Sequence, residues 1–432
     1  MSDLGSLSTG ELQSRLNFLN ARYEEFAGRK LKLNIERGRP GSDQLELSME
    51  MLEFPVAGGD CTTREGLDCR NYGLVDGIPE AKELFAEMLE VSPKEIIIGG
   101  NSSLNMMYDA LSRAMMLGVI DGDGPWNRLP KVKFLCPSPG YDRHFAITEL
   151  FGVELITIDM TQDGPDMDAV ERLAAEDGLI KGIWCTPKYS NPDGITYSDA
   201  VVDRLAGMKT RAADFRIFWD NAYTVHHLTD TPDQLKNIME ACKAAGNPNR
   251  VLIFGSTSKI TFPGAGIAMM AASEANIAQA RKHVGIMTIG PDKLNQLRHV
   301  RFLKNMRGIE EHMKKHAKIL RPKFDMVLDI LQEQLGGLDI AWWNRPRGGY
   351  FISFNTLPGC AAATLRLASE AGLAMTPAGA TYPYGKDPLD RNIRIAPTLP
   401  PLEELKTAME LLCVCVQIAG IRKLLGQLRF TA

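Results

Sequence analysis

Short apolar runs alternate with amphipathic stretches from residue 95 to residue 272, and this alternation limits the possible folds more than any other feature of the sequence. Helical patterns such as Asp168–Ala175 and Asp199–Lys209 separate most of the runs. Short apolar strands joined by helices are typical of a parallel sheet that is covered on both faces. The runs that we predict to be strands are Glu95–Ile98, Lys133–Cys136, Glu154–Ile158, Gly182–Thr186, Phe215–Trp219, Val251–Phe254 and Ile267–Ala272.

Polar and turn-forming residues follow several of these predicted strands at the point where each strand ends. They form the segments Gly99-Gly-Asn-Ser-Ser103, Pro137-Ser-Pro-Gly-Tyr141, Asn191-Pro-Asp-Gly194, Asp220-Asn-Ala-Tyr223 and Ser256-Thr-Ser-Lys259. Taken singly, each segment has an ordinary structural interpretation: Asn191–Gly194 as a turn, Asp220 as a helix cap, Tyr141 as a core aromatic residue, Lys259 as a lysine that caps a strand end, and the segment at 99–103 as a common strand-to-helix turn. In open α/β sheets, however, ligands bind at the carboxyl ends of the strands. Their common position therefore indicates a ligand site.

Lys259 is the candidate reactive group at this edge. It follows an apolar strand and precedes the turn Pro263-Gly-Ala-Gly266. Burial would lower the pKa of its amine, and a neutral lysine amine can form a Schiff base with a carbonyl cofactor. The neighbouring Ser256 and Ser258 could donate hydrogen bonds to a phosphate. The segment at 99–103 lies between a strand and a helix, which would aim free backbone N–H groups at an anion.

The two ends of the chain predict a second layer. A capping box, Ser8-Thr-Gly-Glu11, opens a helix through about Lys30. One long helical stretch runs from Lys293 to Leu335, and we expect Gly308 and Pro322 to interrupt it. A hairpin formed by Asp339–Trp343 and Tyr350–Phe354, a helix Ala361–Gly372, a strand Asn392–Ala396 and a helix from Leu402 follow.

Charge and cysteine usage exclude several classes of function. The 432 residues carry a net charge of −4 without a basic block, so we expect no nucleic-acid surface. None of the eight cysteines forms a Cys-x-x-Cys pair, and we expect neither a disulfide framework nor a metal site. His226 and His227 are interpreted as surface residues. Without a signal pattern or a long apolar span we expect a cytoplasmic protein that does not enter the membrane.

The ordered motifs resemble those of class I, fold-type I aminotransferases, and the resemblance covers nearly the whole chain. The family's Asn-Pro-x-Gly, Asp-x-x-Tyr and lysine motifs stand here as Asn191–Gly194, Asp220–Tyr223 and Ser256–Lys259. Its C-terminal arginine strand stands as Arg394-Ile-Ala396. The segments Tyr72-Gly73 with Gly77-Ile-Pro-Glu80, and Arg347-Gly-Gly-Tyr-Phe351, match as well. The divergent aspartate aminotransferases are the sub-branch that the sequence is most similar to.

This resemblance implies pyridoxal 5′-phosphate as cofactor and assigns a role to each residue of its ring site. Lys259 would bind the aldehyde and then shuttle a proton, and Asp220 would hold the proton on the ring nitrogen. Asn191 and Tyr223 would hydrogen-bond the ring oxygen, and Tyr141 would stack on the ring. The phosphate would be held by Asn101, Ser102, Ser103, Ser256 and Ser258.

The resemblance also implies an architecture and a set of substrate contacts. It predicts a mainly parallel, seven-stranded large domain, residues 56–324, and a smaller α+β domain, residues 1–55 with 325–432. Tyr72 would reach the phosphate of the other subunit, which implies a homodimer with shared active sites. Arg394, with the Gly38 backbone, would bind the α-carboxylate of an amino acid or 2-oxo acid, and Asn191 would also touch the substrate.

Specificity stays open at this point. The family usually has an arginine near the phosphate where this chain has Gly266, and an acidic residue is common at the position of Asn221. Arg143 and Arg39 are candidates to bind a side-chain carboxylate, which would favour aspartate or glutamate; either arginine could equally face solvent. A C–S lyase, or an aminotransferase for aromatic or other amino acids, would use the same scaffold. A DNA-binding regulator is disfavoured because the motifs begin by about Gly38.

Overall fold

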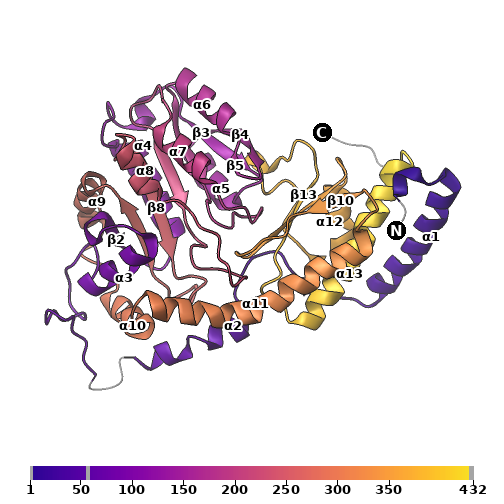
Figure 1. Cartoon of the computed structure of the whole chain (residues 1–432), viewed down its shortest axis with the longest axis horizontal. Helices are drawn as coiled ribbons and strands as arrows, with labels where there is room; N and C mark the ends of the chain where they lie inside the picture. Colours follow the sequence, from indigo (N-terminus) through magenta and orange to yellow (C-terminus); the bar gives the residue numbers. More distant parts are fainter. Residues whose placement is uncertain (1–2, 55–58, 428–432) are drawn as a thin grey trace.

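The computed structural model describes residues 3–54 and 59–427. They form a large sheet with a hydrophobic core on each face and a smaller unit with its own core, the second core; one long helix joins the two. In Figure 1 the large sheet and its helices lie on one side, and α12, α13 and the N-terminal helix α1 lie on the other. Helix α11 (Met306–Leu335) runs beneath both. Its first half packs into one core of the large sheet through Ile309 and Met313, and its second half packs into the core of the smaller unit.

The large sheet has eight strands, in the order β2-β9-β8-β7-β6-β3-β4-β5. The seven expected strands are all present, and the eighth, β5, is a two-residue edge strand that the expectation of seven missed because it is too short to show a pattern. Strands β3, β4, β6, β7 and β8 pair in parallel, whereas β9 runs antiparallel to both of its neighbours. The bounds are β2 Ile96–Ile98, β3 Lys133–Ser138, β4 Glu154–Thr161, β5 Gly164–Pro165, β6 Ile180–Cys185, β7 Arg216–Asp220, β8 Val251–Ser256 and β9 Ala268–Ala272.

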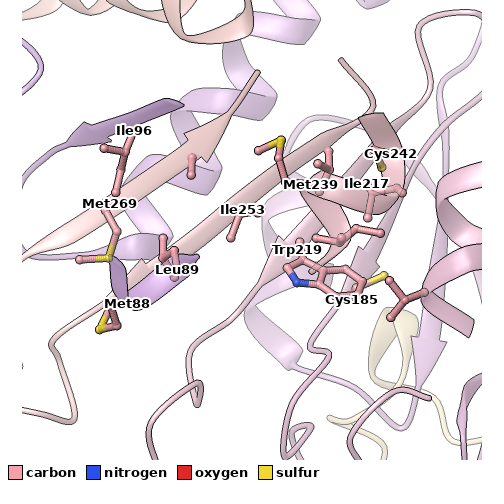
Figure 2. Close-up of a cluster of buried hydrophobic side chains, with 14 of the residues drawn as sticks. Met88, Leu89, Ile96, Cys185, Ile217, Trp219, Met239, Cys242, Ile253 and Met269 are labelled. Atoms are coloured by element: carbon pink, nitrogen blue, oxygen red, sulfur yellow. The ribbon is translucent and has the colours of Figure 1, made fainter. Parts of the chain in front are cut away.

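Alternate residues of the central strands face opposite layers, and both layers are apolar. Ile217, Trp219 and Ile253 belong to the first core, on one face of the large sheet. Phe218 and Phe254 belong to the core on its opposite face. Figure 2 shows part of the first core, in which side chains from the strands meet Met88, Leu89 and Met239 from covering helices. Burial on both faces explains why these strands read as continuous apolar runs.

Helices cover both faces of this sheet. The helices that pack on the first core are α3 (Pro79–Leu89), α6 (Met167–Glu176), α7 (Asp199–Gly207), α8 (Ile238–Ala244) and α10 (Lys293–Leu303). Those that pack on the opposite core are α4 (Ser103–Leu117), α5 (Asp142–Leu150) and α9 (Glu274–Met287). A short helix, α2 (Ser42–Glu46), lies near α11, where Gln44 contacts His316.

The second core contains the two ends of the described chain. The predicted capping box at Ser8 is present and opens α1 (Thr9–Gly28), which packs beside α13 (Leu402–Leu424). The predicted hairpin is also present, with the sheet order β10-β11-β13. A two-residue parallel pair ties the N-terminal segment to this unit. The remaining bounds are β1 Leu33–Asn34, β10 Ala341–Trp343, β11 Ile352–Thr356, α12 Ala361–Glu370, β12 Leu373–Ala374 and β13 Asn392–Ile395.

The expected breaks in the long helical stretch at Gly308 and Pro322 are both wrong. The chain breaks instead at Lys304 and Asn305, between α10 and α11. Lys304 adopts a positive φ of 66°, and the Asn305 side chain accepts a hydrogen bond from the Gly308 N–H at 3.0 Å. The Gly308 N–H therefore takes part in the N-terminal cap of α11. A Cβ at this position would collide with the Leu303 carbonyl. Pro322 lies inside α11, whose buried face continues past it through Phe324 and Val327.

Across residues 3–54 and 59–427, no helix is both long enough and apolar enough to cross a bilayer.

Candidate active site

Three neighbouring parallel strands end at one edge of the large sheet and bring the predicted motifs together. Strand β7 lies between β6 and β8, with Cys185 beside Trp219 and Asp220 beside Phe254. The segments that follow these strands carry Asn191, Asp220 and Lys259 respectively. Because these three strands are adjacent and parallel, the segments that follow them lie at the same edge of the sheet, and this places the three side chains at one site.

Lys259 lies among aromatic rings. Its Nζ atom is 5.1 Å from the ring centre of Tyr223 and 5.7 Å from that of Tyr350. Burial lowers the pKa of the Lys259 amine below its ordinary value, and the charge of Asp220 opposes that shift. The lowered pKa favours the neutral amine, which is the nucleophilic form of lysine.

Asp220 is buried and is oriented by a histidine. Its Oδ2 atom lies 2.9 Å from His144 Nε2, and the His144 ring stacks on Trp184 with 4.4 Å between ring centres. The other carboxylate atom, Oδ1, is buried and has no hydrogen-bond partner among the described residues. Because a buried carboxylate oxygen without a donor is costly, Oδ1 is suited to accept an N–H from a bound molecule.

Tyr141 and Tyr223 lie close to Asp220. Burial raises the pKa of both hydroxyls, and the negative charge of Asp220 contributes to each shift. Both tyrosines therefore stay protonated and can donate hydrogen bonds. Tyr141 packs edge-on against His144, with 5.0 Å between ring centres.

The residues predicted to bind the phosphate lie together where β8 and β2 end. Ser256 Oγ donates to Ser258 Oγ at 3.2 Å, and Ser258 Oγ lies 3.5 Å from the Asn101 carbonyl. Ser102 is the N-cap of α4 and Ser103 is its first residue, and no side chain caps this helix. Hydroxyls and helix N–H groups at one place are the donors that a phosphate needs.

The structure gives a local reason for glycine at position 266. A Cβ there would lie 2.9 Å from both the Phe262 carbonyl and the Thr257 hydroxyl. The turn is packed too closely for any side chain, so an arginine at this position would require the backbone to move. Asn101 secures the same turn by donating to the Gly264 carbonyl at 3.1 Å.

Arg394, on β13 of the second core, is the buried cation of the site. Its Nη1 atom donates to Asp142 Oδ1 at 2.7 Å and lies 3.4 Å from Asn191 Oδ1, and its Nη2 donates to Thr376 Oγ1 at 3.3 Å. The guanidinium lies 5.0 Å from the ring centre of Phe351. Its Nε atom is buried and unpaired among the described residues.

Gly38 lies against the Phe351 ring that Arg394 contacts. A Cβ at Gly38 would be 2.6 Å from Phe351 Cζ, so only glycine lets this backbone approach so closely. Hydrogen bonds fix the segment: Thr376 Oγ1 donates to the Glu36 carbonyl, and Thr398 Oγ1 donates to the Arg39 carbonyl. The N-terminal segment thus reaches the arginine site.

The remaining predicted residues are not drawn into this cluster. Arg143, near the start of α5, and Arg39 are both exposed. Tyr72 is 77% exposed.

The structure adds several residues that the motifs did not reveal. His144 follows Tyr141 by three residues, a helical spacing that could have indicated it. Asp142 reaches Arg394 and had no distinguishing pattern. The interpretation of His226 as a surface residue is wrong: it is buried, its Nε2 lies 3.4 Å from the Lys259 carbonyl, and burial holds its pKa well below the ordinary value.

Comparison with known proteins identifies the family. Residues 7–428 match the family described as "Aspartate amino-transferase". The chain is 48% identical over 422 residues to a putative aminotransferase of Mycolicibacterium smegmatis, covering 98% of this chain and 99% of that one. It is 45% identical over 402 residues to an aspartate aminotransferase of Corynebacterium glutamicum, covering 93% of each.

A solved structure agrees with these sequence relatives. The crystal structure of an aspartate transaminase from C. glutamicum superposes with a TM-score of 0.95 at 43% identity, covering 98% of this chain and 99% of that one. The match therefore includes both cores and the edge at which Lys259, Asp220 and Arg394 meet. The chain belongs to the aspartate aminotransferase family of fold-type I aminotransferases.

Proposed function

We propose that the protein is a pyridoxal 5′-phosphate-dependent aminotransferase that moves an amino group between a dicarboxylic amino acid, aspartate or glutamate, and a 2-oxo acid. One observation carries the proposal: a lysine with a lowered pKa lies at the same sheet edge as a buried carboxylate whose Oδ1, that of Asp220, has no hydrogen-bond partner in the part of the chain that the structure describes. When bound, the cofactor would supply an electron sink for the substrate α-carbon.

The residues of the site fit this cofactor. Asp220 Oδ1 would accept the N–H of the protonated ring, and His144 holds the carboxylate through Oδ2. Tyr223 and Asn191 would donate to the ring oxygen, and Tyr141 would cover the ring face. Asn101, Ser102, Ser103, Ser256 and Ser258 would hold the phosphate with neutral donors, because Gly266 leaves no room for a cation at its position.

Lys259 has two roles in this proposal. It would bind the cofactor aldehyde covalently, since its amine is biased toward the neutral form. The Lys259 amine would also be the group that holds and moves the proton of the substrate α-carbon. Arg394 would bind the substrate α-carboxylate, together with Asn191 and the Gly38 backbone.

Specificity for a second carboxylate would come from Arg143 or Arg39. A side-chain carboxylate held near the cofactor needs a cation, because an unpaired buried charge is costly. Arg143 is the better placed of the two: it lies two residues after Tyr141, and its charge acts on the Tyr141 hydroxyl. The aspartate aminotransferase at 45% identity supports a dicarboxylic donor.

We further propose a cytoplasmic homodimer in which Tyr72 contributes to the active site of the other subunit. Its large exposure supports this arrangement. The eight free cysteines fit a reducing compartment. The division into residues 56–324 and residues 1–55 with 325–432 is supported by the two cores, although its boundary at 55/56 falls outside the described residues.

Donor specificity of the cofactor-loaded enzyme tests the proposal. We expect aspartate and glutamate, with 2-oxoglutarate or oxaloacetate as acceptor, to be turned over far better than alanine or aromatic donors. Arg143→Ala should lower kcat/KM for aspartate by roughly 10-fold to 100-fold, the cost of one charge-assisted contact, while alanine turnover changes little. Arg39→Ala is the matched variant that removes the other candidate arginine, which is also exposed.

Lys259→Ala is the reference for background turnover and should abolish transamination together with the visible absorbance of the covalently held cofactor. Equal losses on aspartate and alanine in both arginine variants would remove the dicarboxylate site. Release of ammonia without formation of an amino acid from the acceptor would instead identify an eliminating enzyme.

A further inference from the structure

The contact between Asp142 and Arg394 joins the first residue of α5 to the middle of β13, from the large sheet to the second core. At 2.7 Å, Asp142 makes the shortest contact to this guanidinium. The Arg394 side chain is 5% exposed and that of Asp142 is 31% exposed. Solvent therefore screens the pair less than it would screen a surface ion pair.

The contact with Asp142 occupies an N–H donor of Arg394 that a substrate carboxylate could use. A guanidinium binds a carboxylate most strongly when two adjacent N–H groups meet its two oxygens. In Arg394 the Nη1 atom donates to Asp142 and Nη2 donates to Thr376, whereas Nε has no partner among the described residues, so the contact that competes with Asp142 is the one made through both Nη atoms. A substrate carboxylate that needs Nη1 must therefore take it from Asp142, because both are anions and cannot share one buried cation at small cost.

Asp142 can give up this cation without being stranded in the interior. It is about one-third exposed and stands in the first turn of α5, where no side chain caps the helix. The free N–H groups of a helix N-terminus favour a negative charge. Displacement is thus reversible, and the position of the carboxylate depends on what occupies Arg394.

We propose that Asp142 is a specificity-determining residue that competes with the substrate α-carboxylate for Arg394. This inference rests on the proposed role of Arg394. The apparent affinity for a carboxylate ligand is the intrinsic affinity multiplied by the fraction of molecules in which Arg394 is free of Asp142. Ligands without a carboxylate cannot displace Asp142. The competition therefore lowers the apparent affinity for a ligand and leaves the rate of the chemical step unchanged.

Binding of succinate to the cofactor-loaded enzyme, measured by calorimetry, tests the inference without turnover, since succinate has neither an amine nor an oxo group. Asp142→Asn should lower the dissociation constant of succinate by roughly fivefold or more, a typical coupling between two exclusive ligands. The KM for aspartate should fall in parallel, while kcat stays within about twofold of the wild type because the chemical step is untouched.

Two further variants separate charge from structure. Asp142→Ser removes the same charge with a different side chain and should also tighten succinate binding. Glu149→Gln removes one negative charge from the far end of α5, where its side chain accepts from the Tyr384 N–H, and should leave succinate binding unchanged.

Unchanged or weaker succinate binding in both Asp142 variants would overturn the inference, since an orienting role for Asp142 predicts weaker binding. Arg394→Gln distinguishes this failure from failure of the proposed function. If Arg394→Gln weakens succinate binding but the Asp142 variants do not strengthen it, only the competition is wrong. If Arg394→Gln binds succinate as the wild type does, the proposed carboxylate site itself is wrong.

Discussion

At the scale of single residues, the site depends on buried polar atoms whose partners are only partly supplied by the protein. Within residues 3–54 and 59–427, Asp220 has one oxygen bonded to His144 and one without a partner, and Arg394 has an unpaired Nε. Such atoms are expensive in a folded core unless a ligand completes their hydrogen bonds. They identify where a bound molecule must place its own donors and acceptors.

Replacement of Asp220 tests whether its carboxylate serves a bound molecule. Asp220→Ala should still bind cofactor, because Lys259 and the phosphate contacts remain, but kcat should fall by roughly two to four orders of magnitude, as expected for loss of about 3–5 kcal/mol from a buried charge pair. His144→Gln should cost much less, because Asp220 keeps its charge. Single-turnover kinetics, with cofactor absorbance as the check on loading, measure both. A near wild-type rate in Asp220→Ala would mean that another group protonates the ring.

Motif residues could be predicted at this scale because their chemistry needs particular side chains at strand ends. Lys259, Asp220 and Asn191 follow predicted strands, whereas Arg394 was indicated by the resemblance to the family's arginine strand, and the structure brings these residues together. His226 could not be placed, because nothing in a sequence shows that a histidine after a strand turns inward. Asp142 was equally hidden, since its partner lies 252 residues away.

At the scale of elements, the segment that carries Lys259 is held by a neighbouring helix. His299 on α10 is fully buried, and its Nδ1 lies 2.8 Å from the Asn295 carbonyl. A carbonyl can only accept, so Nδ1 carries the proton and Nε2 is the acceptor. Nε2 lies 2.9 Å from the Thr261 hydroxyl and 3.2 Å from the Thr257 hydroxyl, on either side of Lys259.

This arrangement predicts a loss of stability in acid. Burial is the main cause that lowers the pKa of His299 to about 4. An unfolded histidine takes up a proton near pH 6.5, whereas the folded one stays neutral, so the unfolded state is favoured increasingly as pH falls from about 6.5 toward 4. Between pH 7 and pH 5, His299 should contribute about 2 kcal/mol to the fall in unfolding free energy.

Chemical unfolding of the wild type and His299→Gln at pH 7 and pH 5 measures this contribution. Glutamine does not titrate, so the variant should be less stable at pH 7 but should lose less stability on acidification. His283→Gln is the control, because that histidine is only half-buried and should contribute less. The same pH dependence in the wild type and His299→Gln would contradict the assignment.

Elements with strong local signals could be predicted, whereas their breaks could not. The capping box at Ser8 and the apolar strands were placed within a few residues. Gly308 and Pro322 suggested breaks because they are poor helix formers. Tertiary packing of the buried face of α11 outweighs these propensities, and the actual break at Lys304 uses a conformation that no propensity indicates.

At the scale of the whole molecule, one predicted site residue, Tyr72, lies on the surface of the described chain. Lys259, Asp220 and Arg394 come together within a single chain. Tyr72 is 77% exposed. If two copies form a closed dimer, each can donate its Tyr72 to the other, which is the arrangement implied by the family resemblance.

Hybrid dimers give the sharpest test of this arrangement. Lys259→Ala and Tyr72→Ala should each be nearly inactive as homodimers, the second because roughly 10-fold to 100-fold of the affinity for cofactor is lost with one phosphate donor. Subunits carrying different affinity tags allow the mixed dimer to be isolated. One of its two sites then combines an intact Lys259 with the intact Tyr72 of its neighbour. The hybrid should recover about half of the wild-type turnover per dimer, because one of two symmetric sites is restored.

A second hybrid serves as the control, because it pairs Lys259→Ala with Asp220→Ala. These two residues serve the same site from the same chain, so neither site of this dimer is intact and no recovery is expected. Recovery in the Tyr72 hybrid alone therefore shows that the site is shared between subunits. If neither hybrid recovers activity, Tyr72 serves its own chain or no site at all, and the shared-site dimer is wrong. Recovery in both hybrids would mean that Lys259 and Asp220 do not serve the same site from the same chain, which would contradict the assignment of both residues to one site.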